Sequence, residues 1–255
     1  MTARMMGTGP SQAWQVSASE VDMTRPALPV RPLRLDAAPR NIVLDANKTA
    51  LVIVDMQNDF CTAGGYMDSR GIDVTPNRAP IAPLQRLVPA ARAAAIPVIW
   101  VNWGVRKDLL NIAPSVRFAH NPDGEGSDIA SPIPGTRSEI LALGSWGAEV
   151  VDELNAKGGD IQVTKHRFSG FWDTDLDAIL RNLGVKSLLI GGVNLDQCVM
   201  TTLEDASFLG YDVVLVEDGA ATTSPACCTE AALYNIKLLF GFVTRADAIV
   251  EGLGA

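Results

Sequence analysis

Short apolar runs alternate with longer amphipathic stretches along most of the chain, starting at Thr49. The first run, residues 50–54, is rich in β-branched residues and ends at Asp55, which is typical of a buried parallel strand. We predict six strands, at residues 50–54, 97–101, 161–164, 187–190, 213–216 and 241–243. Because helical patterns separate these runs, we expect an α/β fold with a parallel sheet covered on both faces.

The amphipathic stretches predict helices at residues 81–95, 150–155, 176–183, 199–209 and 229–240. Thr174 is a candidate cap for the third of them. Pro83 and Pro89 fall within the first, so this helix is expected to begin late or to kink.

Two segments lack a sustained hydrophobic periodicity. Residues 1–46 are rich in Pro, Arg, Ala and Met, and we interpret them as an N-terminal extension, either a disordered tail or an arm that packs on a neighbouring subunit. Residues 47–255 are then expected to form one large globular domain. Residues 102–145 are long and rich in Gly and Pro, which is typical of a functional loop, and we expect a lid or specificity loop there.

Composition excludes several classes of partner. The formal charge of -8 leaves no excess of Lys and Arg to neutralise phosphates, so no nucleic-acid partner is expected. The chain has no long apolar segment and no leader-like N-terminus, which predicts a soluble cytoplasmic protein without a membrane partner. Gly191-Gly192 lacks the spacing of a dinucleotide fingerprint, and no cofactor is predicted.

Cysteine and histidine usage narrows the chemistry further. The four cysteines show no Cys-x-x-Cys pairing, which favours free thiols in a reducing compartment. The two histidines, His120 and His166, are too few for a histidine-based metal site, so we predict no metal. A site in this chain must therefore use carboxylates, Lys or thiols.

Three such residues follow predicted strands. Asp55 follows the first, Lys165 the third, and Cys198 comes after the fourth. Because ligands of open parallel sheets bind beyond the carboxyl ends of the strands, these side chains are expected at one edge. Each also has a simpler interpretation: a turn cap for Asp55, a solvated loop for Lys165 and a buried packing residue for Cys198.

The chemical interpretation makes Cys198 a nucleophile at the start of a helix. The helix N-terminus and the Lys165 ammonium would lower the pKa of the thiol and favour the thiolate. Asp55 would take the thiol proton, protonate the leaving amine and then activate water. His166, next to Lys165, is expected to be structural because adjacent side chains rarely enter the same cleft.

Other residues fit either a substrate-binding role or a structural one. Aromatic residues that could line a pocket are Trp103, Phe168, Phe171 and Trp172. Arginines that could bind a substrate carboxylate are Arg106, Arg117 and Arg167, although each also fits an ordinary surface charge. Packing roles are expected for Cys227 and Cys228, and Cys61 lies in a Gly-rich loop without a base.

Three segments resemble the motifs of isochorismatase-like cysteine hydrolases and occur in the family's order: residues 54–60 (VDMQNDF), the Lys165 loop and residues 192–199 (GVNLDQCV). Within the superfamily the chain is most similar to ureidoacrylate amidohydrolases, through residues 64–68, 144–146, 167–171 and 231–236. Biuret hydrolases and N-carbamoylsarcosine amidohydrolases are more distant relatives. Leu195 replaces a Thr common in that turn, and residues 102–106 depart from the ureidoacrylate pattern.

The resemblance implies a three-layer α/β/α domain, a catalytic triad of Asp55, Lys165 and Cys198, and a homo-oligomer, either a dimer or a tetramer. It also implies an oxyanion hole made by the backbone N–H groups of Asn194 and Cys198, with a cis peptide between Val193 and Asn194. The Asp-x-His-x-x-His metal motif of related nicotinamidases is absent. Candidate substrate-binding residues are Gln57, Asn58, Phe60, Trp103 and Phe168.

The expected function is cysteine-dependent hydrolysis of the C–N bond in a small ureido or amide substrate, through a thioester and with release of ammonia or an amine. A biuret-type or other small-amide substrate is the first alternative. Vinyl-ether hydrolysis of the isochorismatase type is the second, and the presence of Cys198 argues against it. A noncatalytic binding module is the third.

Overall fold

The computed structural model describes residues 3–254 and places a six-stranded sheet at the centre of the molecule. Every pair of neighbouring strands in it is parallel, in the order β11-β10-β9-β6-β7-β8. The strands are β6 (Thr49–Val54), β7 (Val98–Trp103), β8 (Ile161–Lys165), β9 (Ser187–Val193), β10 (Asp212–Ala221) and β11 (Phe242–Thr244). All six predicted strands are confirmed, most of them longer than predicted.

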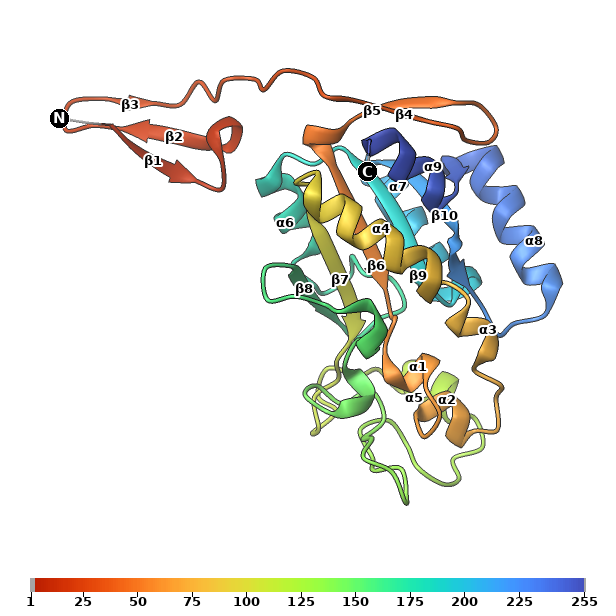
Figure 1. Cartoon of the computed structure of the whole chain (residues 1–255). Helices are drawn as coiled ribbons and strands as arrows, with labels where there is room; N and C mark the ends of the chain where they lie inside the picture. Colours follow the sequence, from red (N-terminus) through yellow and green to blue (C-terminus); the bar gives the residue numbers. More distant parts are fainter. Residues whose placement is uncertain (1–2, 255) are drawn as a thin grey trace.

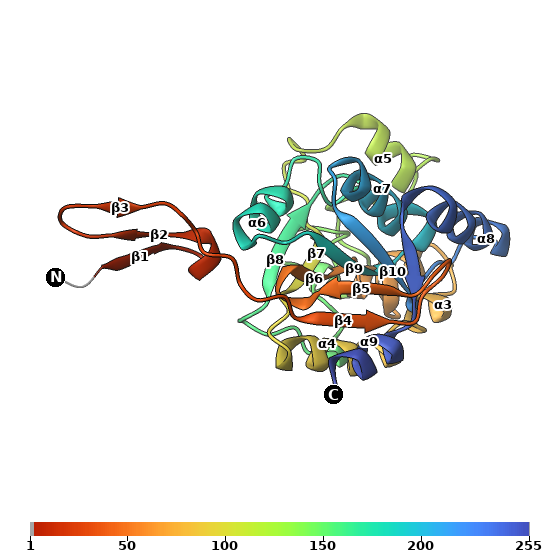
Figure 2. The same ribbon diagram turned by 90° about the horizontal axis from the view of Figure 1, so that it is seen from above.

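Helices cover both faces of this sheet, as Figure 2 shows with α4 and α9 below it and α6, α7 and α8 above it. The helices are α1 (Asn58–Cys61), α2 (Tyr66–Ser69), α3 (Thr75–Arg78), α4 (Ile81–Ala93), α5 (Pro114–His120), α6 (Leu176–Leu183), α7 (Met200–Phe208), α8 (Ala226–Asn235) and α9 (Ala246–Leu253). The predicted three-layer α/β/α fold is therefore confirmed. Among residues 3–254, no helix combines the length and apolar character needed to cross a bilayer.

The sheet order has a functional consequence. Numbered along the chain from β6, the strands lie in the order 3-2-1-4-5-6, which is the doubly wound arrangement. In such sheets the chain turns in opposite directions from the two central strands, and a crevice opens between their carboxyl ends. Here that point lies between β6 and β9.

Some helix predictions need correction. The stretch at residues 150–155 forms only a 3₁₀ turn, η4 (Asp152–Leu154), because Val151 N–H donates to Met56 O and Asn155 has a φ of 46°. The helix predicted at 81–95 starts at Ile81 and contains both prolines. Pro83 lies in the first turn, where no N–H bond is needed, and Pro89 removes a single helical bond. α9 was not predicted.

Capping at α6 also differs slightly. The N-cap position is Asp175 rather than Thr174, although Thr174 Oγ1 accepts the N–H of Leu176 at 3.2 Å. The helix predicted at 229–240 begins earlier, as α8, and continues as a π-helical segment η6 (Ile236–Phe240).

The N-terminal residues contain five strands that the sequence did not predict. β1 (Arg4–Gly7), β2 (Ala13–Val16) and β3 (Val21–Asp22) form an antiparallel sheet that projects from the body (Figure 1), and a short 3₁₀ turn, η1 (Pro10–Gln12), connects β1 to β2. β4 (Pro32–Leu35) and β5 (Ile42–Asp45) form a hairpin followed by η2 (Ala46–Lys48). Leu33 and Leu35 are buried in the core of the body, so the hairpin packs as part of it.

Candidate active site

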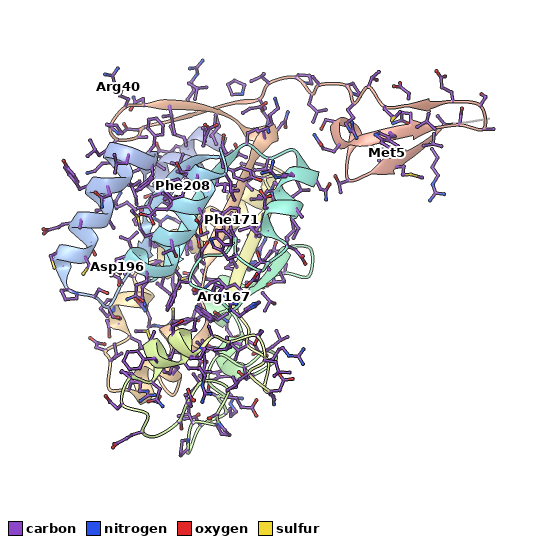
Figure 3. The ribbon with its side chains drawn as sticks, turned by 180° about the vertical axis from the view of Figure 1, so that it is seen from behind. Met5, Arg40, Arg167, Phe171, Asp196 and Phe208 are labelled. Carbon is purple, nitrogen blue, oxygen red and sulfur yellow. The ribbon has the colours of Figure 1, made fainter. Side chains whose placement is uncertain are left out.

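Four adjacent strands bring the candidate residues to one edge. Asp55 follows β6, Trp103 ends β7, Lys165 ends β8, and Cys198 lies in the turn after β9. Trp103 and Lys165 are register partners, and Asp55 and Cys198 lie on the two sides of the switch between β6 and β9. In Figure 3 the labelled Arg167, two residues beyond Lys165, lies where the sheet gives way to the long loop segment.

Local backbone geometry allows β6 and β9 to meet at this edge. Gly192 has a φ of 121°, and a Cβ atom there would collide with the backbone of Val54. Asp55 has a φ of 53°, in the left-handed region that Asp adopts more readily than most residues. The strand therefore turns sharply at Asp55 and aims its carboxylate at the turn that carries Cys198.

Asp55 and Lys165 form a buried ion pair. Lys165 Nζ lies 2.8 Å from Asp55 Oδ2, and neither side chain is more than 1% exposed. Lys165 Nζ also donates to Arg167 O at 3.1 Å. Burial raises the pKa of the Asp55 carboxyl, while the Lys165 charge and hydrogen bond oppose that rise. Asp55 therefore binds a proton more tightly than an exposed aspartate does.

Cys198 is 5% exposed, and Asp55 and Lys165 are the charged groups that act on its thiol. Burial raises the pKa of Cys198 to about 12, and the attraction of Lys165 only partly opposes it. Lys165 lowers the pKa of the thiol, as predicted, but burial is the larger effect; the contribution of the helix N-terminus stays a prediction. Lys165 is already neutralised by Asp55, so burial dominates and the sulfur keeps its proton.

The turn around Cys198 has the predicted cis peptide between Val193 and Asn194. Residues Leu195–Val199 form a π-helical segment, η5, that leads into α7. Asn194 O accepts the N–H groups of Gln197 at 3.1 Å and Val199 at 3.2 Å, which closes the turn on both sides of Cys198. The oxyanion role of the Asn194 and Cys198 N–H groups stays a prediction.

Three of the candidate substrate-binding residues are occupied by protein contacts. Gln57 is fully buried: its Oε1 accepts Trp103 N–H at 2.9 Å, and its Nε2 donates to Trp103 O at 2.8 Å and to Ala148 O. Asn58 Nδ2 donates to Trp146 O at 2.9 Å. Phe60 is buried in the core. Gln57 thus positions Trp103 instead of presenting its own polar atoms.

The other two candidates belong to an aromatic cluster beside the ion pair. Trp103 and Phe168 meet edge-to-face with ring centroids 5.8 Å apart, and Lys165 Nζ lies 4.0 Å from the Trp103 ring centroid. His120 stacks on Phe168 and contacts Trp103. Burial lowers the pKa of His120, whose Nδ1 lies 2.8 Å from Val116 O. The sequence analysis assigned no role to His120, because no local pattern brings residue 120 to Trp103.

Asp59 is a second residue that the sequence analysis did not single out. Its carboxylate accepts bonds from Ser138 Oγ at 2.5 Å, Leu141 N at 2.7 Å and Tyr66 N at 3.0 Å. These contacts fix part of the predicted lid, residues 102–145, against α1 and α2. The Asp-x-x-x-Asp spacing of Asp55 and Asp59 was the available signal.

The candidate arginines all pair with acidic side chains. Arg106 pairs with Asp108 at 2.6 Å, Arg167 with Asp173 at 3.0 Å, and Arg117 with Asp128. Phe171 packs against Tyr211 instead of Trp103, with ring centroids 6.0 Å apart. The exposed Trp172 donates to Asp205 at 2.8 Å. None of these contacts assigns a carboxylate-binding role.

The remaining histidine and thiols lie outside the triad. His166 Nε2 is 3.8 Å from Asp173 Oδ2. Cys61 is buried, with its sulfur 3.5 Å from Asn77 O, and burial raises its pKa to about 12. Cys227 is exposed at the start of α8. Within residues 3–254, no group of three or more His, Cys, Asp or Glu side chains is arranged to hold a metal ion.

Comparison with known proteins identifies the family of the chain. Residues 49–248 match the isochorismatase domain, and this match covers well over half of the chain. A cysteine hydrolase from Pseudomonas syringae pv. phaseolicola 1448A is 27% identical with a TM-score of 0.70, over 91% of this chain and 99% of that one. N-carbamoylsarcosine amidase from Thermoplasma acidophilum is 28% identical with a TM-score of 0.59, over 78% of this chain and 97% of that one. The chain belongs to the isochorismatase family and has the fold of its cysteine hydrolases.

Proposed function

We propose that this protein is an amidohydrolase that uses Cys198 to cleave the C–N bond of a small amide or ureido compound. The observation that carries the proposal is the buried Asp55–Lys165 ion pair, 2.8 Å long, at the switch point of the sheet where the adjacent strand β9 leads into the turn of Cys198. A nucleophile, a base within hydrogen-bond reach and a third group that orients the base are the requirements of covalent acyl transfer.

The buried carboxylate suits both proton transfers. Asp55 accepts the Cys198 proton as the sulfur attacks the carbonyl, and it returns that proton to the departing nitrogen. Its pKa is raised by burial, so it is a stronger base than an exposed aspartate, and Lys165 keeps it ionised until the thiol proton arrives. Ammonia or an amine leaves, and a thioester remains on Cys198.

Water completes the reaction. Asp55, again unprotonated, removes a proton from the water that attacks the thioester, and the sulfur leaves and regains its proton. The Asn194 and Cys198 N–H groups would hold the oxyanion in both steps. These assignments give a role to each residue of the predicted triad and to both backbone N–H groups of the predicted oxyanion hole.

The nature of the substrate rests on resemblance. A solved relative is an N-carbamoylsarcosine amidase, which favours a substrate with an amide or carbamoyl group. A ureidoacrylate-like compound is the finer proposal, supported by residues 64–68, 144–146, 167–171 and 231–236. Residues 102–106 differ from that subfamily, so a biuret-type compound belongs in the same test.

The test is release of ammonia from a panel containing a ureidoacrylate analogue, biuret, carbamoyl amino acids, nicotinamide and simple aliphatic amides. The Cys198→Ala variant is the essential comparison, and Cys227→Ser is its matched control because Cys227 is exposed away from Asp55. Release that requires Cys198 and survives in Cys227→Ser supports the proposal. Equal release by Cys198→Ala, or silence of the folded protein across the panel, contradicts it.

A further inference from the structure

Trp103 occupies a central position among the catalytic strands. It is the last residue of β7, between β6, which precedes Asp55, and β8, which ends in Lys165. Gln57 binds both its backbone N–H and its carbonyl, at 2.9 and 2.8 Å. The residue is 2% exposed, and its position is therefore fixed before any substrate arrives.

This single residue contacts two members of the triad and lies at the strand edge that carries the third. Its backbone N–H reaches Asp55 Oδ1 at 3.2 Å. The face of its ring lies under the Lys165 ammonium, 4.0 Å from the centroid. Its indole N–H is fully buried at the same strand edge, which also carries Cys198. A side chain that only packed against the substrate would not need these contacts with the triad.

The indole N–H is a buried donor that lacks a good acceptor. Within residues 3–254, no hydrogen-bond partner of normal geometry is found for Trp103 Nε1. A neutral thiol is a weak acceptor, and a buried donor without a partner is unfavourable. A thiolate is a far better acceptor. Consistent with this, the Trp103 indole acts to lower the pKa of Cys198, against the larger effect of burial.

We propose that Trp103 is a fourth catalytic residue, whose indole N–H stabilises the negative charge that develops on the Cys198 sulfur. The proposal rests on the proposed role of Cys198 as nucleophile. The thiol proton moves to Asp55, and the electron pair left on sulfur forms the bond to the substrate carbonyl carbon. When water displaces the thioester, that pair returns to sulfur, and the indole N–H stabilises it a second time. Because the interaction is stronger in the charged states than in the resting thiol, it accelerates both steps.

A role in substrate binding alone would predict different behaviour. A ring that only packs against substrate would change KM and leave ionisation of the free enzyme's thiol unaffected. A donor to sulfur would change ionisation of Cys198 in the absence of substrate. The two roles are therefore separable by a measurement on the full-length protein alone.

The experiment measures the rate at which iodoacetamide alkylates Cys198, followed by mass spectrometry of its peptide, between about pH 7 and pH 10. Two variants remove the donor: Trp103→Phe, and benzothienylalanine at position 103, which keeps the shape of the bicyclic ring but replaces the N–H with sulfur. Trp172→Phe is the control, because it removes an indole N–H that binds Asp205 at the surface.

We expect alkylation of Cys198 to slow about 10- to 100-fold in both variants at every pH, and kcat to fall by a similar factor with little change in KM. The Trp172→Phe control should have the alkylation rate and kcat of the unmodified protein. Wild-type alkylation rates in the benzothienylalanine protein would overturn the proposal, even if Trp103→Phe misfolds. Because alkylation needs no substrate, absence of amidase activity would count against the proposed function without affecting this result.

Discussion

Lys165 and Asp55 form an ion pair 2.8 Å apart at the switch point of the sheet, with both side chains essentially excluded from solvent. Neither charge is stable there without the other, because desolvation of an isolated ion is far more costly than its remaining hydrogen bonds can offset. The pair is thus a structural element as well as a catalytic one, and the two roles lead to separate predictions.

Removal of one partner should destabilise the fold. We expect Lys165→Met to lower the free energy of unfolding by about 3–5 kcal/mol, since it leaves the Asp55 carboxylate buried without its counterion. The Asp55→Asn/Lys165→Met double variant should recover much of that loss because no buried charge remains. Urea unfolding followed by circular dichroism measures both.

The control for this prediction is the exposed ion pair of Arg86 and Asp247. Arg86→Ala should leave the unfolding midpoint nearly unchanged, because water solvates both charges. A single Lys165→Met variant as stable as the unmodified protein would show that the pair contributes nothing to folding.

Asp55 also determines the expected pH dependence of activity. The base must be unprotonated to accept the thiol proton, so kcat/KM should fall as the pH drops through the pKa of Asp55. Burial raises that pKa from 3.8, and the acid limb should therefore have its midpoint above that value. No alkaline loss is expected from Cys198 below about pH 10, because burial keeps its pKa near 12. An acid limb centred at the ordinary aspartate value would contradict the effect of burial on the pKa of Asp55.

Much of this arrangement was predictable because strand patterns are local. The residue after an apolar run lies at a carboxyl end whatever the rest of the chain does, and so Asp55, Lys165 and Cys198 were candidates from their positions. The resemblance to the family motifs then implied that they form a triad. The ionisation of Cys198 was not predictable from local patterns, because it depends on the balance between burial and the charge of Lys165, which is already paired with Asp55. The contacts of Trp103 and His120 depend on side-chain packing between segments distant in sequence. β4 escaped notice because its burial comes from α9, more than two hundred residues later.

Asp59 should prove important for the loop that borders the site. Asp59→Asn keeps the size of the side chain but replaces an acceptor oxygen with an amide donor, opposite Ser138 or Leu141 N–H. We expect a loss of stability of about 1–3 kcal/mol and a raised KM, because the loop loses its anchor on α1. Asp68→Asn, which alters an exposed bond to Gly64 N, is the matched control.

The same carboxyl gives a signed pH effect on stability. Burial raises the pKa of Asp59 above 3.8, so the folded protein binds its proton more tightly than the unfolded chain does. The stability advantage over Asp59→Asn should therefore be greatest at acid pH and decrease as the pH rises through the folded pKa. Urea titrations of both proteins across that pH range measure this difference in stability. A difference that grows as the pH rises would show that the hydrogen bonds to Asp59 affect its pKa more than burial does.

Gly192 should be the least replaceable residue in the sheet. It combines a φ of 121° with a close approach to the backbone of Val54, so a Cβ atom would strain the chain and push β9 away from β6. We expect Gly192→Ala to cost about 3 kcal/mol or more and to abolish activity, since the Cys198 turn would move away from Asp55. Gly158→Ala is the control, because its added Cβ meets nothing within 4 Å. Equal unfolding midpoints for the two variants would mean that the strands can separate without loss, and that their close contact does not hold the nucleophile against its base.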